Sequence, residues 1–536
     1  MSTDDISRQL SDMFEDSERE EYSSSSSSSE EEEEDAGNEL DHEEWQSTGQ
    51  LPTFPFENVG HMNIGPAECP FDFFGLFFNT TFMAALVSSI NTHALRVLLE
   101  STHQHSRIQN WKDTNVNELK IFMGILFHMG HIKLNRINDY WRSDLLFNLP
   151  FKNFMSRDRF LVILRNFCFN DDIEYNNNDP NRFVKPIINF FNTLMKTLVV
   201  PPQNLTIDET VVLWRGRLKI RQYIQGKRHK YGVKLYVLTD TNGITQKMHM
   251  YCGAQDVELQ GRGHADKVVM MLMEDYLNVG HSLYMDNFYN SVSLAENLLS
   301  KKTHVTGTLR PNRSRNPAIT KSKLKKGDLL SRINSRGVSV THYKDKRSVY
   351  MISTEHNSDF VEHTNKSGRT VLKPKVIVQY NKYMKGVDRK DQLLAYYPCY
   401  NKSTRWYKKI ILHVMQVMLL NAFMLYNEHQ RRTDNSNIMT FYDFRLDVVR
   451  KLLNINANTN SSSSSNATTR KITTIKGEDI HLPEELPKND NGKTKRKDCR
   501  YCLETRNLRK ATLYYCPLCI KKPGLCLKCF RDYHKY

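Results

Sequence analysis

Four aspartates stand in sequence contexts where a carboxylate could do chemistry. TIDET places Asp208 within an apolar run, and LYMDNFYNS places Asp286 directly after one. KGVDRKDQ places Asp388 on a helical pattern, with Asp391 one turn later. Aspartate is depleted in strands, so an aspartate at a strand end needs a reason. Asp286 could cap the helix expected to begin near Ser291, or it could act together with the other carboxylates.

Three carboxylates that converge in one place repel one another unless cations bind between them. Hard oxygen ligands with room for water and phosphate suit Mg²⁺ or Mn²⁺. Two such ions can hold the attacking and leaving oxygens of an in-line phosphoryl displacement. We therefore predict Asp208, Asp286 and Asp388 as catalytic residues that bind two Mg²⁺ or Mn²⁺ ions. This chemistry needs no covalent enzyme intermediate, so no Ser, Tyr or His nucleophile is expected.

The segments that carry these aspartates read as a mixed sheet covered by helices. Apolar, β-branched runs predict strands, and apolar spacings of three and four predict helices. The expected strands cover 204–214, 231–240, 247–253, 281–287 and 304–310, and the expected helices cover 266–277, 291–300 and 374–398. This order describes an α/β layer. Asp208 and Asp286 would lie on neighbouring strands, and Asp388 would reach them from a packed helix.

Changes of composition and pattern divide the rest of the chain. The apolar segment 410–426 contains His413, Gln416 and Asn421, so we expect a buried core helix there and no membrane span. The expected domains are a disordered acidic tail (1–55), a helical domain (56–203 and 397–455), a catalytic core (204–311 and 375–396), an insertion of hairpins (312–374), a flexible basic linker (456–496) and a Cys-rich zinc-binding domain (497–536).

The charge of the chain is unevenly distributed. Residues 1–50 contain 18 Asp/Glu and two Lys/Arg, a net charge of −16, whereas the whole chain carries +15. The rest of the chain therefore carries +31, which favours a nucleic-acid partner over a merely basic soluble protein. The Ser- and Glu-rich tail cannot bury a core. It could be phosphorylated and compete with DNA for the basic surface, or it could only aid solubility.

Six of the ten cysteines form three Cys-x2-Cys pairs near the C-terminus. Because no secretory signal is expected, this clustering favours metal over disulfides. Cysteine pairs at this spacing fit tetrahedral Zn²⁺, and so short a domain needs the metal in order to fold. The predicted zinc ligands are Cys499, Cys502, Cys516, Cys519, Cys526, Cys529 and His534. Two closed sites need eight ligands; Asp532, Asp498 or His481 could supply the eighth, or one site could be incomplete.

These motifs together resemble those of the piggyBac-type transposases. The resemblance rests on TIDETVVLWRGR, LYMDNFYNS, GTLRPNR, YNKYMKGVDRKDQ and the terminal Cys/His array, and it covers the chain from about residue 70 to the end. It implies an α/β RNase H-like catalytic core with a strand-rich insertion, flanked by an all-α domain split in sequence, plus a small C-terminal zinc-binding cross-brace module. The all-α domain would serve dimerisation and DNA binding.

The resemblance also implies roles for particular residues. Asp208, Asp286 and Asp388 match the family's catalytic triad, and Asp391 matches a nearby acid that supports it. Members of the family act as homodimers on double-stranded DNA. They bind terminal repeats, cut through hairpins, insert at TTAA sites and excise without a scar. Other matches are a basic pair implicated in handling target DNA, Arg310 and Arg313, and a tryptophan near the active site, Trp406, which could equally be a helix-end aromatic.

Three function classes remain open at this point. The leading prediction is an active, Mg²⁺-dependent DNA transposase located in the nucleus, for which KTKRK (493–497) could be an import signal or only a solvated basic run. A domesticated descendant that binds DNA without cutting it is the second. The third is an RNase H-like nuclease unrelated to transposition, which would need neither the zinc tail nor the helical flanks.

Overall fold

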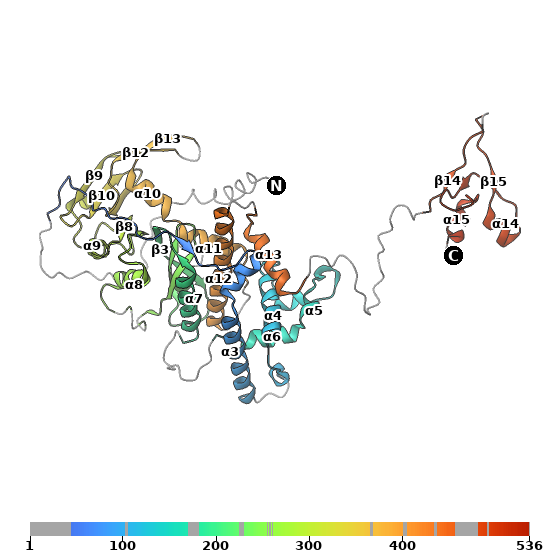
Figure 1. The fold of residues 1–536 in the computed structure, drawn as a ribbon, viewed down its shortest axis with the longest axis horizontal. Helices are drawn as coiled ribbons and strands as arrows, with labels where there is room; N and C mark the ends of the chain where they lie inside the picture. The colour runs from blue at the N-terminus through green and yellow to red at the C-terminus, as the bar shows by residue number, and fades with distance from the viewer. Residues whose placement is uncertain are drawn as a thin grey trace. The chain divides into compact units, whose positions relative to one another are not determined.

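The computed structural model divides into two compact units, 1–458 and 459–536, which are described separately (Figure 1). The described residues are 44–101, 106–169, 182–224, 230–253, 256, 259, 261–364, 368–399, 405–433, 437–455, 481–489 and 492–534. Most of the expected acidic tail (1–55) and most of the expected linker lie outside these residues. The last part of that tail, 44–55, is described, and the backbones of Gln46 and Ile333 exchange two hydrogen bonds at 2.9 Å, so the order of the first unit begins before residue 55.

A nine-stranded mixed sheet forms the centre of the first unit. Within it, β3 (Asn204–Leu213) pairs antiparallel with β5 (Tyr231–Asp240) and parallel with β7 (Ser282–Met285). Strand β7 pairs parallel with β8 (His304–Thr308), and β6 (Thr245–Met250) lies on the far side of β5. The predicted α/β class is therefore confirmed, and β3 and β5 occupy nearly the residues expected for them.

The insertion continues this sheet. Strand β11 (Ser348–Ser353) pairs with β8, and β10 (Ser339–Lys344) and β9 (Leu329–Ile333) follow outward. A separate hairpin is formed by β12 (Phe360–Thr364) and β13 (Thr370–Pro374), while the short β4 (Gln222–Tyr223) ends the sheet beside β5. The first three strands of the insertion thus belong to the same sheet as β7, the strand that Asp286 follows.

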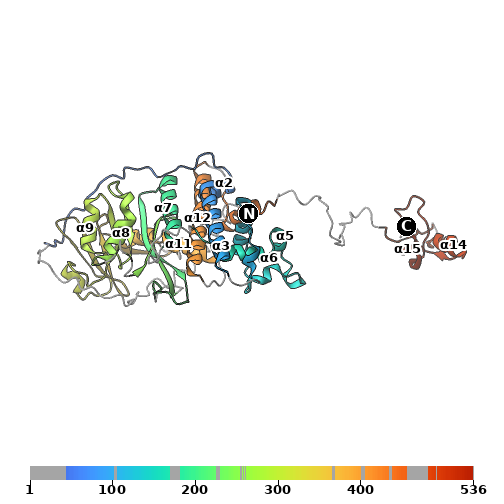
Figure 2. The same cartoon turned by 90° about the horizontal axis from the view of Figure 1, so that it is seen from below.

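Each face of the sheet packs on a different core, as the alternation of side chains along a strand requires. Leu205, Ile207 and Leu238 face α8 (His264–Met273) and α9 (Val292–Ser300). Val212, Leu235 and Val237 belong to the larger core, which includes α7 (Lys185–Leu198) and α12 (Trp406–Arg432). Figure 2 shows α8 and α9 on one side of the central strands and α7 and α12 on the other.

Helices from both ends of the first unit build the larger core together. Before the sheet come α2 (Pro70–Phe77), α3 (Thr80–Leu99), α4 (Val116–His128), α5 (Phe151–Phe154) and α6 (Arg157–Asn166). After it come α12 and α13 (Phe441–Leu452), which pack on α2 and α4. Both α3 and α12 are long and apolar enough to span a membrane by length and composition, but the most apolar window of α12 is 94% buried. It is the core helix expected at 410–426.

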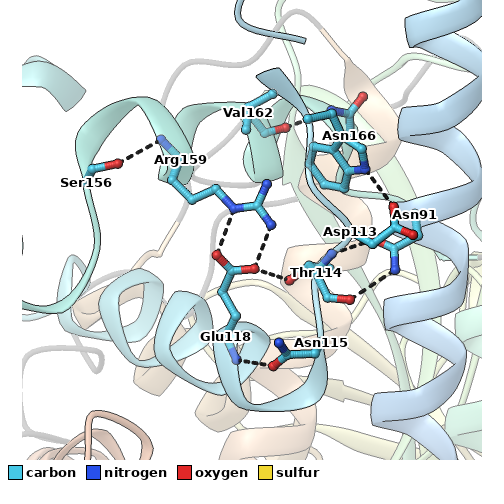
Figure 3. A network of polar contacts seen from close by, with 10 residues as sticks. Asn91, Asp113, Thr114, Asn115, Glu118, Ser156, Arg159, Val162 and Asn166 are labelled. Atoms are coloured by element: carbon cyan, nitrogen blue, oxygen red, sulfur yellow. Dashed lines mark hydrogen bonds and ion pairs between the residues drawn. The ribbon is translucent and has the colours of Figure 1, made fainter. Parts of the chain in front are cut away.

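A polar network ties α3, α4 and α6 together (Figure 3). Arg159 on α6 donates from Nε and Nη2 to the two carboxylate oxygens of Glu118 on α4, at 2.7 and 2.6 Å. Thr114 Oγ1 donates to Glu118 at 2.8 Å, and Asn91 on α3 exchanges two hydrogen bonds with the Thr114 backbone. Burial by itself would raise the pKa of Glu118, but these hydrogen bonds outweigh it and lower the pKa. The bidentate pair fixes how the three helices pack.

The single helix expected over 374–398 is two helices, α10 (Lys375–Tyr383) and α11 (Gly386–Tyr396). At the break, the Tyr383 carbonyl accepts a hydrogen bond from Thr206 Oγ1 on β3, at 2.9 Å. Gly386 lies so close to the sheet that a Cβ there would be 2.3 Å from the Asp240 carbonyl oxygen. The chain therefore turns where it docks on the sheet, a contact that local sequence does not reveal. The break places Asp388 in the first turn of α11.

The second unit is small and built around cysteines. Its elements are β14 (Glu484–Glu485), β15 (Lys497–Asp498), α14 (Arg500–Arg506), β16 (Ala511–Thr512), β17 (Tyr514–Tyr515) and α15 (Leu527–Tyr533). Strand β14 pairs with β17, and β15 pairs with β16. The boundary expected at residue 497 thus falls inside the unit, because 481–489 contributes a strand to it.

A candidate carboxylate active site and two zinc clusters

Asp208 and Asp286 lie side by side on parallel strands. Ile207 of β3 is the register partner of Met285 of β7, so the two aspartates follow at the next position of each strand. Asp208 Oδ1 accepts the Glu209 N–H at 2.8 Å, and Asp286 Oδ1 accepts the Phe288 N–H at 2.9 Å. The alternative role of Asp286 as a helix cap is not seen, because Ser291 Oγ caps α9 by accepting the Leu294 N–H at 3.1 Å.

Asp388 reaches the same face of the sheet from α11. Thr206 and Thr210 share one face of β3 with Asp208, because side chains alternate along a strand. Thr206 bonds the Tyr383 carbonyl just before α11, and Thr210 Oγ1 bonds the Asp391 carboxylate at 3.0 and 3.1 Å. These two anchors bracket Asp208 on the strand and Asp388 on the helix, so Asp388 lies in the part of α11 that packs over the Asp208 segment of β3.

The pKa of one tyrosine hydroxyl is raised by all three carboxylates. Tyr380 on α10 is partly buried, and burial is the largest cause that raises the pKa of its hydroxyl. The negative charges of Asp286, Asp208 and Asp388 raise this pKa further, while a hydrogen bond with Thr308 on β8 lowers it. A single phenol therefore lies within the electrostatic reach of the whole predicted triad.

The carboxylates fit a site for divalent cations that substrate would complete. Among the described residues, the groups whose ligand atoms all lie within 4.8 Å of one another are in the second unit, and the three aspartates are not brought that close. Mg²⁺ is commonly held by one or two carboxylates, with waters and substrate phosphates filling its octahedron. The three aspartates lie on adjacent elements without surrounding a single point, which leaves coordination positions for water and phosphate.

Asn290 fixes the end of the strand that carries Asp286. Its side chain is buried, and Nδ2 lies 3.0 Å from the carbonyl oxygens of Met285 and Asp286 and 2.9 Å from that of Thr308. Gly307 makes room for this amide, since a Cβ there would be 2.1 Å from Asn290 Nδ2. The ends of β7 and β8 are thus joined beside the candidate site.

We expect Asn290→Ala to destabilise the first unit. The substitution leaves buried carbonyl groups without a donor, which costs about 1–3 kcal/mol. Urea unfolding followed by near-ultraviolet circular dichroism of the full chain measures the loss. The matched control is Asn297→Ala, since Asn297 is exposed on α9 and its substitution should leave the transition unchanged. Equal transitions for the two variants would contradict the role given to Asn290.

The two arginines predicted to contact DNA both lie at the loop that follows Asp286, but only one of them hydrogen-bonds to that loop. Arg313 Nη2 donates to the Phe288 carbonyl at 2.6 Å, so this guanidinium braces the loop itself. Arg310 is exposed, and its guanidinium lies 5.7 Å from the centre of the Phe288 ring. Trp406 begins α12, partly buried against the larger core, and none of its described contacts is to an aspartate of the triad.

Several residues of the site were not among those predicted. Asn290, Thr210 and Lys390 contact the aspartates or the elements that carry them, and Tyr380 bonds Thr308 on the neighbouring strand β8. Asn290 offers a weak signal, a polar residue four positions after Asp286 in an otherwise apolar stretch. In the sequence, Lys390 looks like an ordinary solvent-exposed charge between Asp388 and Asp391. Its burial results from the packing of α11 on the sheet, which the sequence does not show.

In the second unit, the predicted zinc ligands gather in two groups of four. The first group is Cys499, Cys502, Cys526 and Cys529, and the second is His481, Cys516, Cys519 and His534. The first cysteine pair therefore shares a site with the third, the interleaved pattern that the family resemblance implies. Tetrahedral sets of four thiolates, or of two thiolates and two imidazoles, are those that structural Zn²⁺ takes, so the residues present fit zinc.

His481 fills the position left open by the count of seven ligands. Its Nδ1 lies 3.1 Å from Cys516 Sγ and 3.5 Å from Cys519 Sγ. His534 Nδ1 donates to the Phe530 carbonyl oxygen at 2.7 Å, which leaves Nε2 to face Cys519 Sγ at 3.3 Å. Such a hydrogen bond fixes the tautomer of a zinc-binding histidine. Asp498 and Asp532 belong to neither group.

Comparisons with known proteins agree with this architecture. Residues 69–423 match the family described as Transposase IS4, and residues 481–535 match the family described as DDE_Tnp_1-like zinc finger. The human PiggyBac transposable element-derived protein 3 is 27% identical over 62% of this chain and 58% of its own length. The human PiggyBac transposable element-derived protein 2 is 26% identical over 67% of this chain and 61% of its own length.

A solved structure shares the fold. The piggyBac transposase in a cryo-EM structure of its synaptic complex with hairpin DNA matches with a TM-score of 0.64 and 23% identity, over 91% of this chain and 98% of that one. The alignments to the two human relatives span less than two thirds of those proteins. At this identity the structural likeness concerns the fold.

Proposed function

Because the chain belongs to the family described as Transposase IS4, whose model matches residues 69–423, we propose that it is a cut-and-paste DNA transposase of the piggyBac type. It binds the terminal repeats of its own element, nicks and forms hairpins at the ends, integrates at TTAA sites and later excises without a scar. The observation that carries the proposal is geometric: the register of β3 and β7 places Asp208 beside Asp286, and the hydrogen bonds of Thr206 and Thr210 place α11, which carries Asp388, over β3. A domain that only binds DNA has no use for three carboxylates that repel one another.

The protein's own groups give the reaction its geometry. Asp208, Asp286 and Asp388 would hold two Mg²⁺ or Mn²⁺ ions, which when bound lower the pKa of water and stabilise charge on phosphate oxygens. The Phe288 N–H orients the Asp286 carboxylate, and Asn290 holds the strand behind it. No side chain needs to bond covalently to DNA. The exposed Arg310 guanidinium, over the Phe288 ring of the Asp286 loop, is suited to a backbone phosphate.

The second unit is suited to bind DNA outside the catalytic centre. A groove of about 660 Å³ in it is lined by Lys495, Arg496, Lys497 and Lys522, together with polar residues. Phosphate contacts of this kind supply sequence-independent affinity that falls with salt. We propose that this groove and the helical domain bind the terminal repeats. A homodimer in the nucleus, with KTKRK as the import signal, belongs to the same proposal.

A second candidate function is a DNA-binding protein that no longer cuts. The observation that favours it is that the human relatives are named as transposable element-derived proteins. Such a protein would keep its zinc clusters and its basic groove while its carboxylates lost their use. The three aspartates and the residues that brace them are all present here, which favours retained catalysis.

A cleavage assay tests the choice between these functions. The substrate is an end-labelled duplex that carries the DNA flanking the protein's own gene, beside a TTAA site, and products are resolved on a denaturing gel. We expect nicked and hairpin products with Mg²⁺ and none with EDTA or with a shuffled duplex. Tight binding of the flanking duplex without any Mg²⁺-dependent product would overturn the transposase in favour of the binding protein.

A further inference from the structure

Asp391 is held by two neighbours that also hold each other. Thr210 Oγ1 on β3 lies 3.0 and 3.1 Å from the two oxygens of the Asp391 carboxylate. Lys390 Nζ donates to Thr210 Oγ1 at 2.6 Å and lies 3.1 Å from Asp391 Oδ1. The ammonium thus donates to the hydroxyl, which in turn donates to the carboxylate. The three side chains close a ring across the contact of α11 with the sheet.

The burial of Lys390 shows that this ring is not an exposed ion pair. The Lys390 side chain is 1% exposed, whereas that of Asp391 is 33% exposed. A buried ammonium is costly unless an opposite charge and hydrogen-bond acceptors compensate it. Thr210 and Asp391 are the two acceptors that the structure gives it. The Asp391 carboxylate is therefore already committed to compensating a buried cation.

We propose that Thr210 and Lys390 are positioning residues, which use Asp391 as a fixed anchor to set the register of α11 so that Asp388 faces Asp208. The inference rests on the proposed function, because it assigns these roles within the same metal-dependent site. It makes Asp391 a positioning residue and not a metal ligand.

The geometry of α11 requires such an anchor. One end of the helix is fixed where Thr206 bonds the Tyr383 carbonyl, and Asp391 is the next hydrogen-bonded contact with β3. A helix turns about 100° and rises about 1.5 Å per residue, so a slip by one residue would turn Asp388 away from the strand. The Thr210 contact ties the second turn of α11 to β3, four residues beyond Thr206 on the strand.

The charges point in the same direction. Asp391 lies one helical turn from Asp388, so a free carboxylate there would add a fourth negative charge to the site and compete for the ions. The Lys390 ammonium at 3.1 Å offsets that charge. The metal ions would then bind the triad carboxylates, while the Asp391 carboxylate stays paired with Lys390.

Thr210→Val and Thr210→Ser form the matched pair that tests the anchor. Valine keeps the shape of threonine but removes the hydroxyl, whereas serine keeps the hydroxyl. Two readouts besides cleavage apply to the zinc-loaded full chain: hydrogen exchange of the amides of 386–396 by mass spectrometry, and Mn²⁺ affinity from the free Mn²⁺ signal in electron paramagnetic resonance. We expect Thr210→Val to speed amide exchange and to weaken Mn²⁺ binding about 10–100-fold, and Thr210→Ser to behave like the unmodified chain.

A cysteine exchange separates a ligand from an anchor. A thiolate that replaces a direct ligand shifts the metal preference toward softer ions, so Asp388→Cys should bind Cd²⁺ better than the unmodified chain does at this site. Asp391→Cys should show no such gain. Unchanged exchange and Mn²⁺ affinity in Thr210→Val, or a Cd²⁺ gain in Asp391→Cys equal to that in Asp388→Cys, would overturn the proposal.

Lys390→Met provides a third variant, which removes the charge and keeps the length of the side chain. We expect it to weaken Mn²⁺ binding as Thr210→Val does, and an unchanged affinity would count against the charge argument. Failure of the proposed function looks different. In that case the unmodified chain gives no Mg²⁺-dependent products on the flanking duplex, whereas the exchange and metal-binding readouts still report on the anchor.

Discussion

Asp286→Asn should reduce strand cleavage by about 10³-fold, the scale of effect seen when one preorganised electrostatic group is removed from an active site, and should leave DNA binding intact. The amide keeps the shape of the carboxylate, and its oxygen can still accept the Phe288 N–H. What it loses is the negative charge that a divalent cation needs. Pre-incubated protein and flanking duplex, started with Mg²⁺ and sampled over time, give the rate.

Two comparisons make this result specific to the site. Asp359→Asn is the matched control, because Asp359 is exposed beside the β12 hairpin and its substitution should leave the rate unchanged. Fluorescence anisotropy with the same duplex should give equal affinities for both variants and the unmodified chain. A fall in rate of less than tenfold for Asp286→Asn, with folding intact, would show that the carboxylates do not act as the proposed metal ligands.

Removal of zinc should unfold the second unit completely while the first unit stays folded. The buried core of this unit consists of five cysteines, Leu525 and Phe530, so little apolar surface remains to hold it without metal. Binding of structural zinc is worth about 10–16 kcal/mol in small domains and is then the folding energy itself. A strong chelator added to the full chain, with zinc counted by elemental analysis and folding followed by NMR, measures both effects.

Single ligand variants test the grouping of the clusters. Cys502→Ser and His481→Ala should each lose one zinc ion of the two expected, because the two residues belong to different groups of four. Cys69→Ser and Asp498→Ala are the matched controls and should keep both ions, since neither residue belongs to a group. A retained ion in His481→Ala, or well-dispersed NMR signals from residues 481–534 after chelation, would contradict the assignment.

The elements around the site could largely be predicted from local patterns. Alternation and helical spacing correctly predict the positions of strands β3, β5, β7 and β8 and of helix α9. They do so because these periodicities depend only on residues that are close together in the sequence. The break between α10 and α11 could not be predicted. It depends on the contact of Gly386 with Asp240 and of Tyr383 with Thr206, residues nearly 150 or more positions away in the chain.

The zinc unit shows the same division. Six cysteines in x2 pairs are a local signal, because two ligands of one tetrahedral ion must come from a tight turn. His481 lies 18 residues before the first pair, in a segment whose composition reads as a linker. Only the pairing of β14 with β17 brings that segment back to Cys516 and Cys519.

The sequence by itself determined the reactive parts of this protein: three aspartates in strand and helix contexts, three cysteine pairs, a basic body and an α/β order of elements. These are properties of residue type and short spacing. The tertiary structure alone decided which parts meet. It joined the first cysteine pair to the third, packed the helix that carries Asp388 over the strand that carries Asp208, and buried Lys390 against Thr210, 180 residues away. The physical reason is that each of these contacts forms between elements whose relative positions depend on the packing of the whole sheet and its helices.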